Sequence, residues 1–198
     1  MKERIGALFI ILLLIWPVES SCGGKYTKRP GKDPRTASLL PGDDEIEGWK
    51  RFGEMFRASN EVELYKCIDG GAGLYINHGF QAYAGQLYRS REGLEVEIAI
   101  YDQGSAENAR ELYQDPVIKA DPGKALEALG DEARIDERGL FVYGVEFIQD
   151  RFFVRVLIQD RTEDGLNIAL LFAHHVSERI KSLLTDSFLL KGPQSSLV

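Results

Sequence analysis

The sequence has few of the residues that cross-link chains or bind metals. Its 198 residues include two cysteines and three histidines, so the disulfide framework of a small secreted domain is not available. The motifs G-x-S-x-G and H-E-x-x-H do not occur, and no acidic segment has the D-x-[DN]-x-[DN]-G spacing of a calcium loop. These absences exclude the enzyme and metal-site classes that such motifs mark. We therefore expect no catalytic centre of those types, no metal and no cofactor.

No hydrophobic run is long enough to cross a membrane as a helix. The longest, residues 5–16, has about 12 residues, whereas a spanning helix needs roughly 20. Lys2 and Arg4 precede this run, and residues 17–21 follow it with a proline and small side chains. This layout is typical of a secretory signal. We therefore expect export and interpret residues 1–22 as a signal peptide, with a short uncleaved anchor as the alternative.

Cys22 stands where the signal peptide ends. The Ser20-Ser21 pair before it resembles a bacterial lipobox, in which the cysteine is diacylated and becomes the mature N-terminus, although Glu19 replaces the usual aliphatic residue. We predict that Cys22 is lipidated, and ordinary cleavage or an uncleaved anchor are the alternatives. Two acyl chains anchor a protein stably, so a membrane is the expected partner. Cys67 then has no partner cysteine and is expected to be a small buried hydrophobe.

Basic charge is concentrated in one short segment. The chain carries a net charge of −7, and residues 23–38 carry five basic side chains against one acidic one, a net of +4. Because the charges of residues 1–22 cancel, residues 39–198 carry −7 − 4 = −11. An acidic body disfavours binding to nucleic acid, whose phosphates need positive partners. We interpret 23–38 as a basic flexible tether that lies on anionic headgroups, with a solvated linker as the alternative.

Residues 39–190 have the patterns of a single α+β domain, followed by a frayed tail at 191–198. Prolines and glycines in 39–54 predict no regular element there. Asn60 is expected to cap a helix, with Gly79 as its left-handed terminator. Further helices are predicted after the cap residue Ser105, at 122–130, and from about 163 to 184.

Alternation of apolar and polar residues predicts the strands. They are expected at 80–89, 94–101, about 132–137, 140–148 and 152–160. Each clear strand has one apolar face. The economical fold is therefore a single antiparallel sheet of about five strands, covered by helices in two layers.

Three motifs within residues 39–115 resemble a known family. They are LLPGDDEIEGWKRFGE, LYKCIDGGAGLYINHGF and VEIAIYDQGS. In this order they resemble a family of bacterial exported proteins classed as a domain of unknown function, whose members read roughly LLP…I.GW…GE, YINGGAELYLEYGF and IYDMGS. The resemblance implies export and an α+β fold, and it implies no activity.

The stretch CIDGGAGLY, residues 67–75, places glycines around a carboxylate. A phosphate loop needs a strand before the glycines and a helix after them, but here the glycines interrupt a predicted helix. Each glycine within a helix costs roughly 1 kcal/mol relative to alanine, which favours close packing or a distorted turn as their reason. A kink that contacts a ligand through Asp69 and backbone amides is the alternative.

These patterns predict a non-enzymatic binding or accessory module of the bacterial envelope, with an envelope protein as a possible partner. Aromatic and small residues are expected to gather at a ligand-contacting surface formed by Asp69, Gly70, Gly71, Tyr75 and Trp49.

The alternative function is a hydrolase-like enzyme that uses Cys67 or Asp69 with His78. It requires Cys67 to be partly exposed and within hydrogen-bond reach of His78. His174 and His175 are adjacent on a predicted helix and point about 100° apart, so they are not expected to share a metal.

Overall fold

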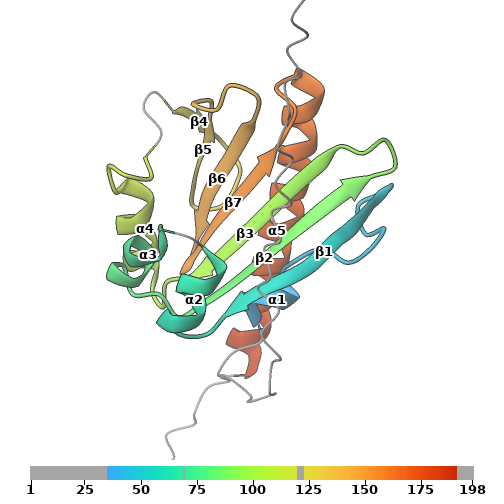
Figure 1. Ribbon diagram of the computed structural model, residues 1–198. Coiled ribbons are helices and arrows are strands. Elements are labelled where there is room, and N and C mark those ends of the chain that lie inside the picture. Colours follow the sequence, from blue (N-terminus) through green and yellow to red (C-terminus); the bar gives the residue numbers. More distant parts are fainter. Residues whose placement is uncertain (1–34, 69, 120–122, 191–198) are drawn as a thin grey trace, which may run out of the picture.

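Within the described residues, seven strands form one antiparallel sheet (Figure 1). The structure, a computed structural model, describes residues 35–68, 70–119 and 123–190. The strands are β1 (Trp49–Ala58), β2 (Ala82–Ser90), β3 (Glu95–Asp102), β4 (Lys124–Leu126), β5 (Glu132–Asp136), β6 (Tyr143–Gln149) and β7 (Phe152–Ile158). The helices are α1 (Arg35–Ser38), α2 (Glu61–Cys67), α3 (Ala72–Asn77), α4 (Ala106–Gln114) and α5 (Glu163–Leu190). Cys22 lies outside the described residues.

The strands have the order β1-β2-β3-β7-β6-β5-β4, and every neighbouring pair is antiparallel. Pairing of β3 with β7 joins the two halves of the sheet at its centre. The α+β class with one antiparallel sheet is therefore confirmed. The expected number of about five strands is wrong, because β1 and β4 extend the sheet at its two edges.

Both edge strands lie where the sequence predicted other structure. In β1, Gly53 has a φ of +73° and lies where the register against β2 shifts between Phe52 and Phe56. The glycine therefore forms a bulge inside the strand instead of ending it. The helix predicted at 122–130 is also wrong, because Lys124–Leu126 pair with β5. Strand pairing there overrides the helix propensity of the alanines and leucines.

The other elements occur near their predicted positions. β2, β3, β5, β6 and β7 start and end within three residues of the predicted strands. Asn60 and Ser105 cap α2 and α4 as expected, since each side-chain oxygen accepts the N–H three residues later, at 3.0 and 3.2 Å. α5 begins where predicted and continues six residues further, to Leu190.

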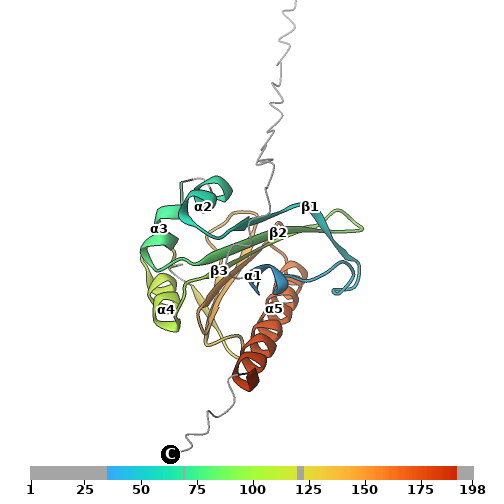
Figure 2. The same cartoon turned by 90° about the horizontal axis from the view of Figure 1, so that it is seen from below.

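Helices cover both faces of the sheet, so the domain has three layers and the expectation of two is wrong (Figure 2). α1 and α5 lie on one face, and α2, α3 and α4 lie on the other. Side chains at even positions of β2, β3 and β7 pack toward α5, and those at odd positions pack toward α2–α4. This is the period of two of a pleated strand. The central strands are therefore hydrophobic on both faces.

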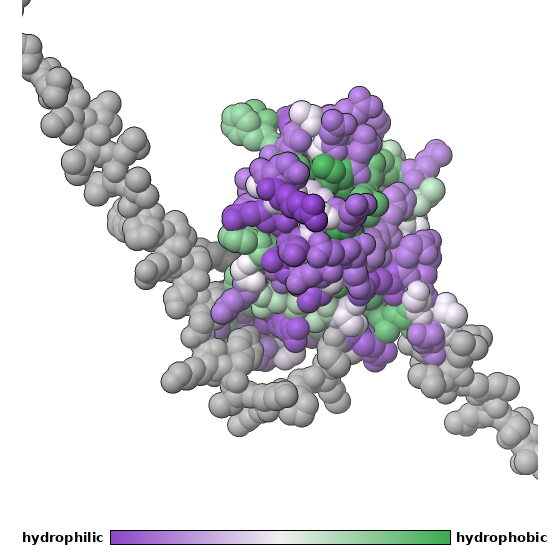
Figure 3. Space-filling model, turned by 90° about the vertical axis from the view of Figure 1, so that its right-hand side faces the viewer, coloured by the Kyte–Doolittle hydropathy of each residue, from purple (hydrophilic) through white to green (hydrophobic). Residues whose placement is uncertain are grey.

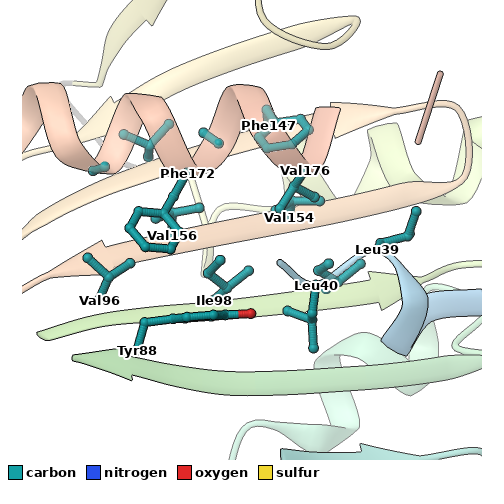
Figure 4. Close-up of a cluster of buried hydrophobic side chains, with 14 of the residues drawn as sticks. Leu39, Leu40, Tyr88, Val96, Ile98, Phe147, Val154, Val156, Phe172 and Val176 are labelled. Atoms are coloured by element: carbon teal, nitrogen blue, oxygen red, sulfur yellow. The ribbon is translucent and has the colours of Figure 1, made fainter. Parts of the chain in front are cut away.

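The larger core lies between the sheet and α5 (Figure 4). Phe172 of α5 is fully buried, and its ring lies 5.2 Å from the rings of Trp49 and of Tyr88. Leu39 and Leu40, which precede β1, are also buried in this core. The described part of the domain therefore includes α1, and the last four residues of the segment expected as a tether are helical.

Arg179 of α5 fixes the N-terminal segment. Its Nη1 donates to the carbonyl of Ser38 at 2.7 Å, and its Nη2 forms a short ion pair with Glu45. On the sheet side, the hydroxyl of Tyr88 donates to the carbonyl of Pro41 at 2.9 Å. These contacts therefore hold α1 and the segment after it beside the second half of α5 (Figure 1).

Candidate functional site

The glycine-rich stretch divides one predicted helix into two. α2 ends at Cys67, Gly70 has a φ of +70°, and Gly71 is the N-cap of α3 without a side-chain cap. Glycine adopts a positive φ more readily than any residue with a side chain, so the backbone favours glycine at position 70. A distorted turn is thus confirmed as the reason for this glycine. Gly79, with a φ of +83°, follows α3 as the predicted terminator.

Tyr75 points from α3 into the smaller core. Its ring stacks on that of Tyr101 of β3, with centroids 3.9 Å apart and planes at 10°, and Tyr83 lies 4.9 Å from Tyr101. All three side chains are buried, and burial raises the pKa of each hydroxyl. These tyrosines are therefore neutral. Tyr75 holds α3 on the sheet and does not face solvent.

Trp49 lies on the other face of the sheet, in the core beneath α5. Its ring meets Phe172 edge to face at 89°. The predicted surface that combined Tyr75 with Trp49 is therefore not formed. Gly70 is exposed and Gly71 is half-buried, whereas Asp69 lies outside the described residues.

Cys67 and His78, the pair of the enzyme alternative, have different partners. The Sγ of half-buried Cys67 lies 3.5 Å from the carbonyl oxygen of Arg57 in β1. The Nε2 of His78 hydrogen-bonds to Oδ2 of Asp115 at 3.1 Å. In the described residues no hydrogen bond joins this cysteine to this histidine. A nucleophile with an adjacent base is thus not assembled.

His78 instead connects α3 to α4. Its Nδ1 lies 3.9 Å from Oε2 of Glu111, while its Nε2 contacts Asp115 just after α4. Hydrogen bonds from the Val117 N–H and from His78 hold the pKa of Asp115 below its usual range. The two carboxylates contact different ring nitrogens and do not converge on one position. Across the described ranges, no group of three or more histidine, cysteine, aspartate or glutamate side chains is placed to hold a metal ion.

A buried ion pair, which the sequence reasoning missed, crosses the sheet between β5 and β6. Arg134 and Glu146 are paired in the strand register, and their side chains are 6% and 1% exposed. The Arg134 Nε donates to Oε2 of Glu146 at 2.8 Å, and Nη1 donates to the carbonyl of Tyr113 at 2.6 Å. The guanidinium carbon also lies 3.9 Å above the Tyr113 ring. The pair therefore fixes the end of α4 to the sheet.

Further charges extend this network along the same face. Arg155 of β7 lies 3.3 Å from Glu146, and Arg138 donates to both carboxylate oxygens of Asp136, at 2.9 and 2.7 Å. Burial raises the pKa of Asp136, but hydrogen bonds from Arg138 outweigh this effect and hold it below the usual range. A signal for the network was available, because β5, β6 and β7 each place charged residues between apolar ones.

A shallow groove of about 560 Å³ lies beside this network, between α4 and the β4–β5 hairpin. Its lining includes Leu126, Glu132 and Arg134. The volume is in the range of small-molecule sites. However, Glu132 pairs with Arg110 and Arg134 pairs with Glu146, so two of its charged groups already have partners.

Comparisons with known proteins do not assign the chain to a family. No family model matches the sequence, and no curated protein matches it. A solved structure that is similar is the crystal structure of the extracellular domain of PknH from Mycobacterium tuberculosis. It has a TM-score of 0.45 and 14% sequence identity, over 76% of this chain and 98% of that chain. A likeness at this level assigns neither a fold family nor a function.

The reactive side chains of the described domain thus hold secondary-structure elements together. Cys67 joins α2 to β1, His78 joins α3 to α4, and Arg134 joins α4 to the sheet. None of the described helices is both long and apolar enough to cross a membrane.

Proposed function

We propose that this chain is an exported protein held at a membrane by its N-terminus, and that its α+β domain acts as a non-enzymatic binding or accessory module of the bacterial envelope. The secretory layout of residues 1–22 and the lipobox-like position of Cys22 support the anchor. The resemblance of the three motifs to a family of exported proteins supports the same location and stays a prediction.

The observation that carries the proposal is the way the N-terminal segment joins the domain. This segment is fixed by hydrogen bonds from Arg179 and Tyr88 and by the buried side chains of Leu39 and Leu40. A force applied to the chain at α1 would therefore be transmitted to the core of the domain. Between Cys22 and the first described residue lie 12 residues, which span at most about 43 Å when fully extended. A lipidated Cys22 would therefore keep the domain close to the membrane surface.

The structural partners of the reactive side chains favour a binding module over the hydrolase-like alternative. Cys67 contacts a backbone carbonyl and His78 contacts Asp115. An enzyme that pairs these two residues would have to move Cys67 from the Arg57 carbonyl toward His78, because no hydrogen bond joins the two in the described residues.

Two cysteine substitutions test the anchor. The variant Cys22→Ser removes the predicted lipidation site, and Cys67→Ser is the matched control because it leaves that site intact. We expect wild type and Cys67→Ser in the membrane fraction, with an intact mass that includes a cleaved leader and two acyl chains. Cys22→Ser is expected to lack this modification. An unmodified mature N-terminus at Ser21 or Gly23 in the wild-type protein contradicts the anchor.

Alkylation kinetics test the enzyme alternative separately. We expect Cys67 to react with iodoacetamide as an ordinary half-buried thiol, at a rate that His78→Gln leaves unchanged. Fast alkylation that depends on His78 would instead indicate an activated thiolate and would favour the hydrolase-like function.

A further inference from the structure

The connection between β5 and β6 presents two adjacent hydrophobic side chains to solvent. Leu140 and Phe141 are 78% and 79% exposed, more than any other large hydrophobic side chain among the described residues. Single exposed hydrophobic residues are normal on protein surfaces, but here two neighbours share one projecting loop. On the face shown in Figure 3 the hydrophobic residues form separate patches among hydrophilic ones.

The base of this loop is held in place, so the exposure of its tip is a built feature. A Cβ at Gly139 would lie 2.2 Å from the side chain of half-buried Val142, so the loop closes tightly on itself there. The Nη1 of Arg161 donates to the carbonyl of Gly139 at 2.6 Å. Arg138 binds Asp136 and the carbonyl of Ile118. These hydrogen bonds hold Arg138 and Gly139 on the N-terminal side of the tip, and β6 begins at Tyr143 on its C-terminal side.

Two arginines lie at the base of the apolar tip, and one of them, Arg138, forms an ion pair with Asp136. The side chain of Arg138 is 42% exposed, and the guanidinium of Arg161 reaches the loop backbone. An apolar tip with long basic side chains behind it fits the boundary between acyl chains and headgroups, where the apolar part is buried and the charged part stays wet. The acidic body, with a net charge of −11 over residues 39–198, would be repelled by anionic lipid elsewhere, which limits the contact to this tip.

The tip is also within reach of the proposed anchor. In Figure 1 the β5–β6 connection and the start of α5 lie together at the top of the molecule, and α1 lies beside the lower half of α5. From Glu163 to Arg179 α5 rises about 24 Å, at 1.5 Å per residue. The 12 residues after Cys22 span up to about 43 Å, so the tip and the lipidated cysteine can touch one bilayer at the same time.

We propose that Leu140 and Phe141 insert into the bilayer to which the N-terminus is anchored and thereby orient the domain on its surface. This inference rests on the proposed membrane anchor. One such tip is a weak membrane ligand by itself, but the short spacer makes its insertion intramolecular and so raises its effective concentration. The partner is the hydrocarbon boundary of the membrane, and burial of the two apolar side chains supplies the attraction.

Fluorescence of a tryptophan placed at the tip tests the insertion. Phe141→Trp is compared with the matched control Val62→Trp, which places the same probe at an exposed site on α2. Both carry Trp16→Phe, which removes a tryptophan from the leader, and Trp49 is buried in both. The membrane-extracted full chain is reconstituted into phosphatidylcholine vesicles with or without bromine on the acyl chains. We expect blue-shifted, bromine-quenched emission from Phe141→Trp and unquenched emission from Val62→Trp.

Flotation of the same vesicles separates the two proposals. If the protein floats and Phe141→Trp is unquenched, or both probes are quenched equally, the insertion is wrong and the anchor stands. A tip that is unquenched but shielded from aqueous acrylamide indicates that a second copy of this chain covers it, and the insertion is then wrong. If the protein does not float with the vesicles, both the anchor and the insertion that rests on it are wrong.

Discussion

Glu146 is the residue whose replacement tests the internal electrostatics of the domain most directly. Its carboxylate is buried against Arg134 and also contacts Arg155, and the Arg134 side chain is 6% exposed. The substitution Glu146→Leu keeps a side chain of similar volume but leaves the guanidinium of Arg134 without its counterion. The group cannot move into water, because it also donates to the Tyr113 carbonyl and stacks on the Tyr113 ring.

The expected loss follows from what remains buried. Removal of one partner of a buried ion pair costs about 3–5 kcal/mol, because the other charge is left uncompensated. In the double variant Arg134→Met/Glu146→Leu neither charge is buried, and apolar replacement of a buried pair is often close to neutral. The Tyr113 carbonyl then lacks the donor Nη1, at a cost of about 1–3 kcal/mol. The double variant is therefore expected to be more stable than Glu146→Leu alone.

Urea unfolding at pH 7, followed by circular dichroism and by Trp49 fluorescence, measures these differences. The control is Arg110→Met, which breaks the surface pair of Arg110 with Glu132, whose side chains are 56% and 36% exposed. It should cost no more than about 1 kcal/mol. If Glu146→Leu costs as little as this control, or if the double variant is the less stable of the two, the reasoning about the buried pair is wrong.

Three further substitutions test the core, a turn and an acid group. Phe172→Ala removes the fully buried ring at the centre of the larger core and should cost about 3–5 kcal/mol in urea unfolding, whereas Leu171→Ala, at a 53% exposed site, should change stability by less than about 0.5 kcal/mol. Gly79→Ala should lower the melting temperature more than Gly93→Ala. Both have positive φ, but only at Gly79 would a Cβ meet a backbone oxygen, at 3.0 Å; equal losses would show that the close approach is unimportant. The pKa of Asp136 is held below its usual range in the folded state, so its contribution is present above the unfolded pKa of about 3.9 and is lost as pH falls through the folded pKa. The urea midpoint of Asp136→Asn should therefore fall less steeply than that of the wild type below about pH 4. Equal dependence of the two midpoints on pH in this range would contradict the prediction.

Local patterns were sufficient for the elements that carry their own signals. The alternation of Val96, Ile98 and Ile100 predicted β3, and the caps Asn60 and Ser105 predicted the starts of two helices that the structure confirms. These signals are short-range, because they depend on the period of one strand or on one turn of backbone.

The elements and contacts that the sequence did not reveal depend on pairing between distant residues. β4 exists because three residues meet β5, and β1 continues through Gly53 because β2 supplies its hydrogen bonds on both sides of the bulge. The expected contact surface failed for the same reason. Tyr75 and Trp49 are both aromatic residues near glycines, but the register of β1 sets the face of Trp49, and the packing of α3 on the opposite face of the sheet sets that of Tyr75.

Together, the two proposals predict how the domain is oriented relative to the membrane. The N-terminal segment and the β5–β6 tip both adjoin α5, one beside Arg179 and the other beside its first turn. A domain held at both points lies with α5 toward the membrane, because both contacts then reach one plane. The opposite face of the sheet, which carries α2, α3 and α4 (Figure 2), then points away from the lipid. That face carries the exposed side chains of Val62 and Tyr65 and the turn at Gly70. A partner of the module would therefore meet the glycine-rich stretch as part of the outward surface, while the tyrosine stack beneath it keeps α3 in place.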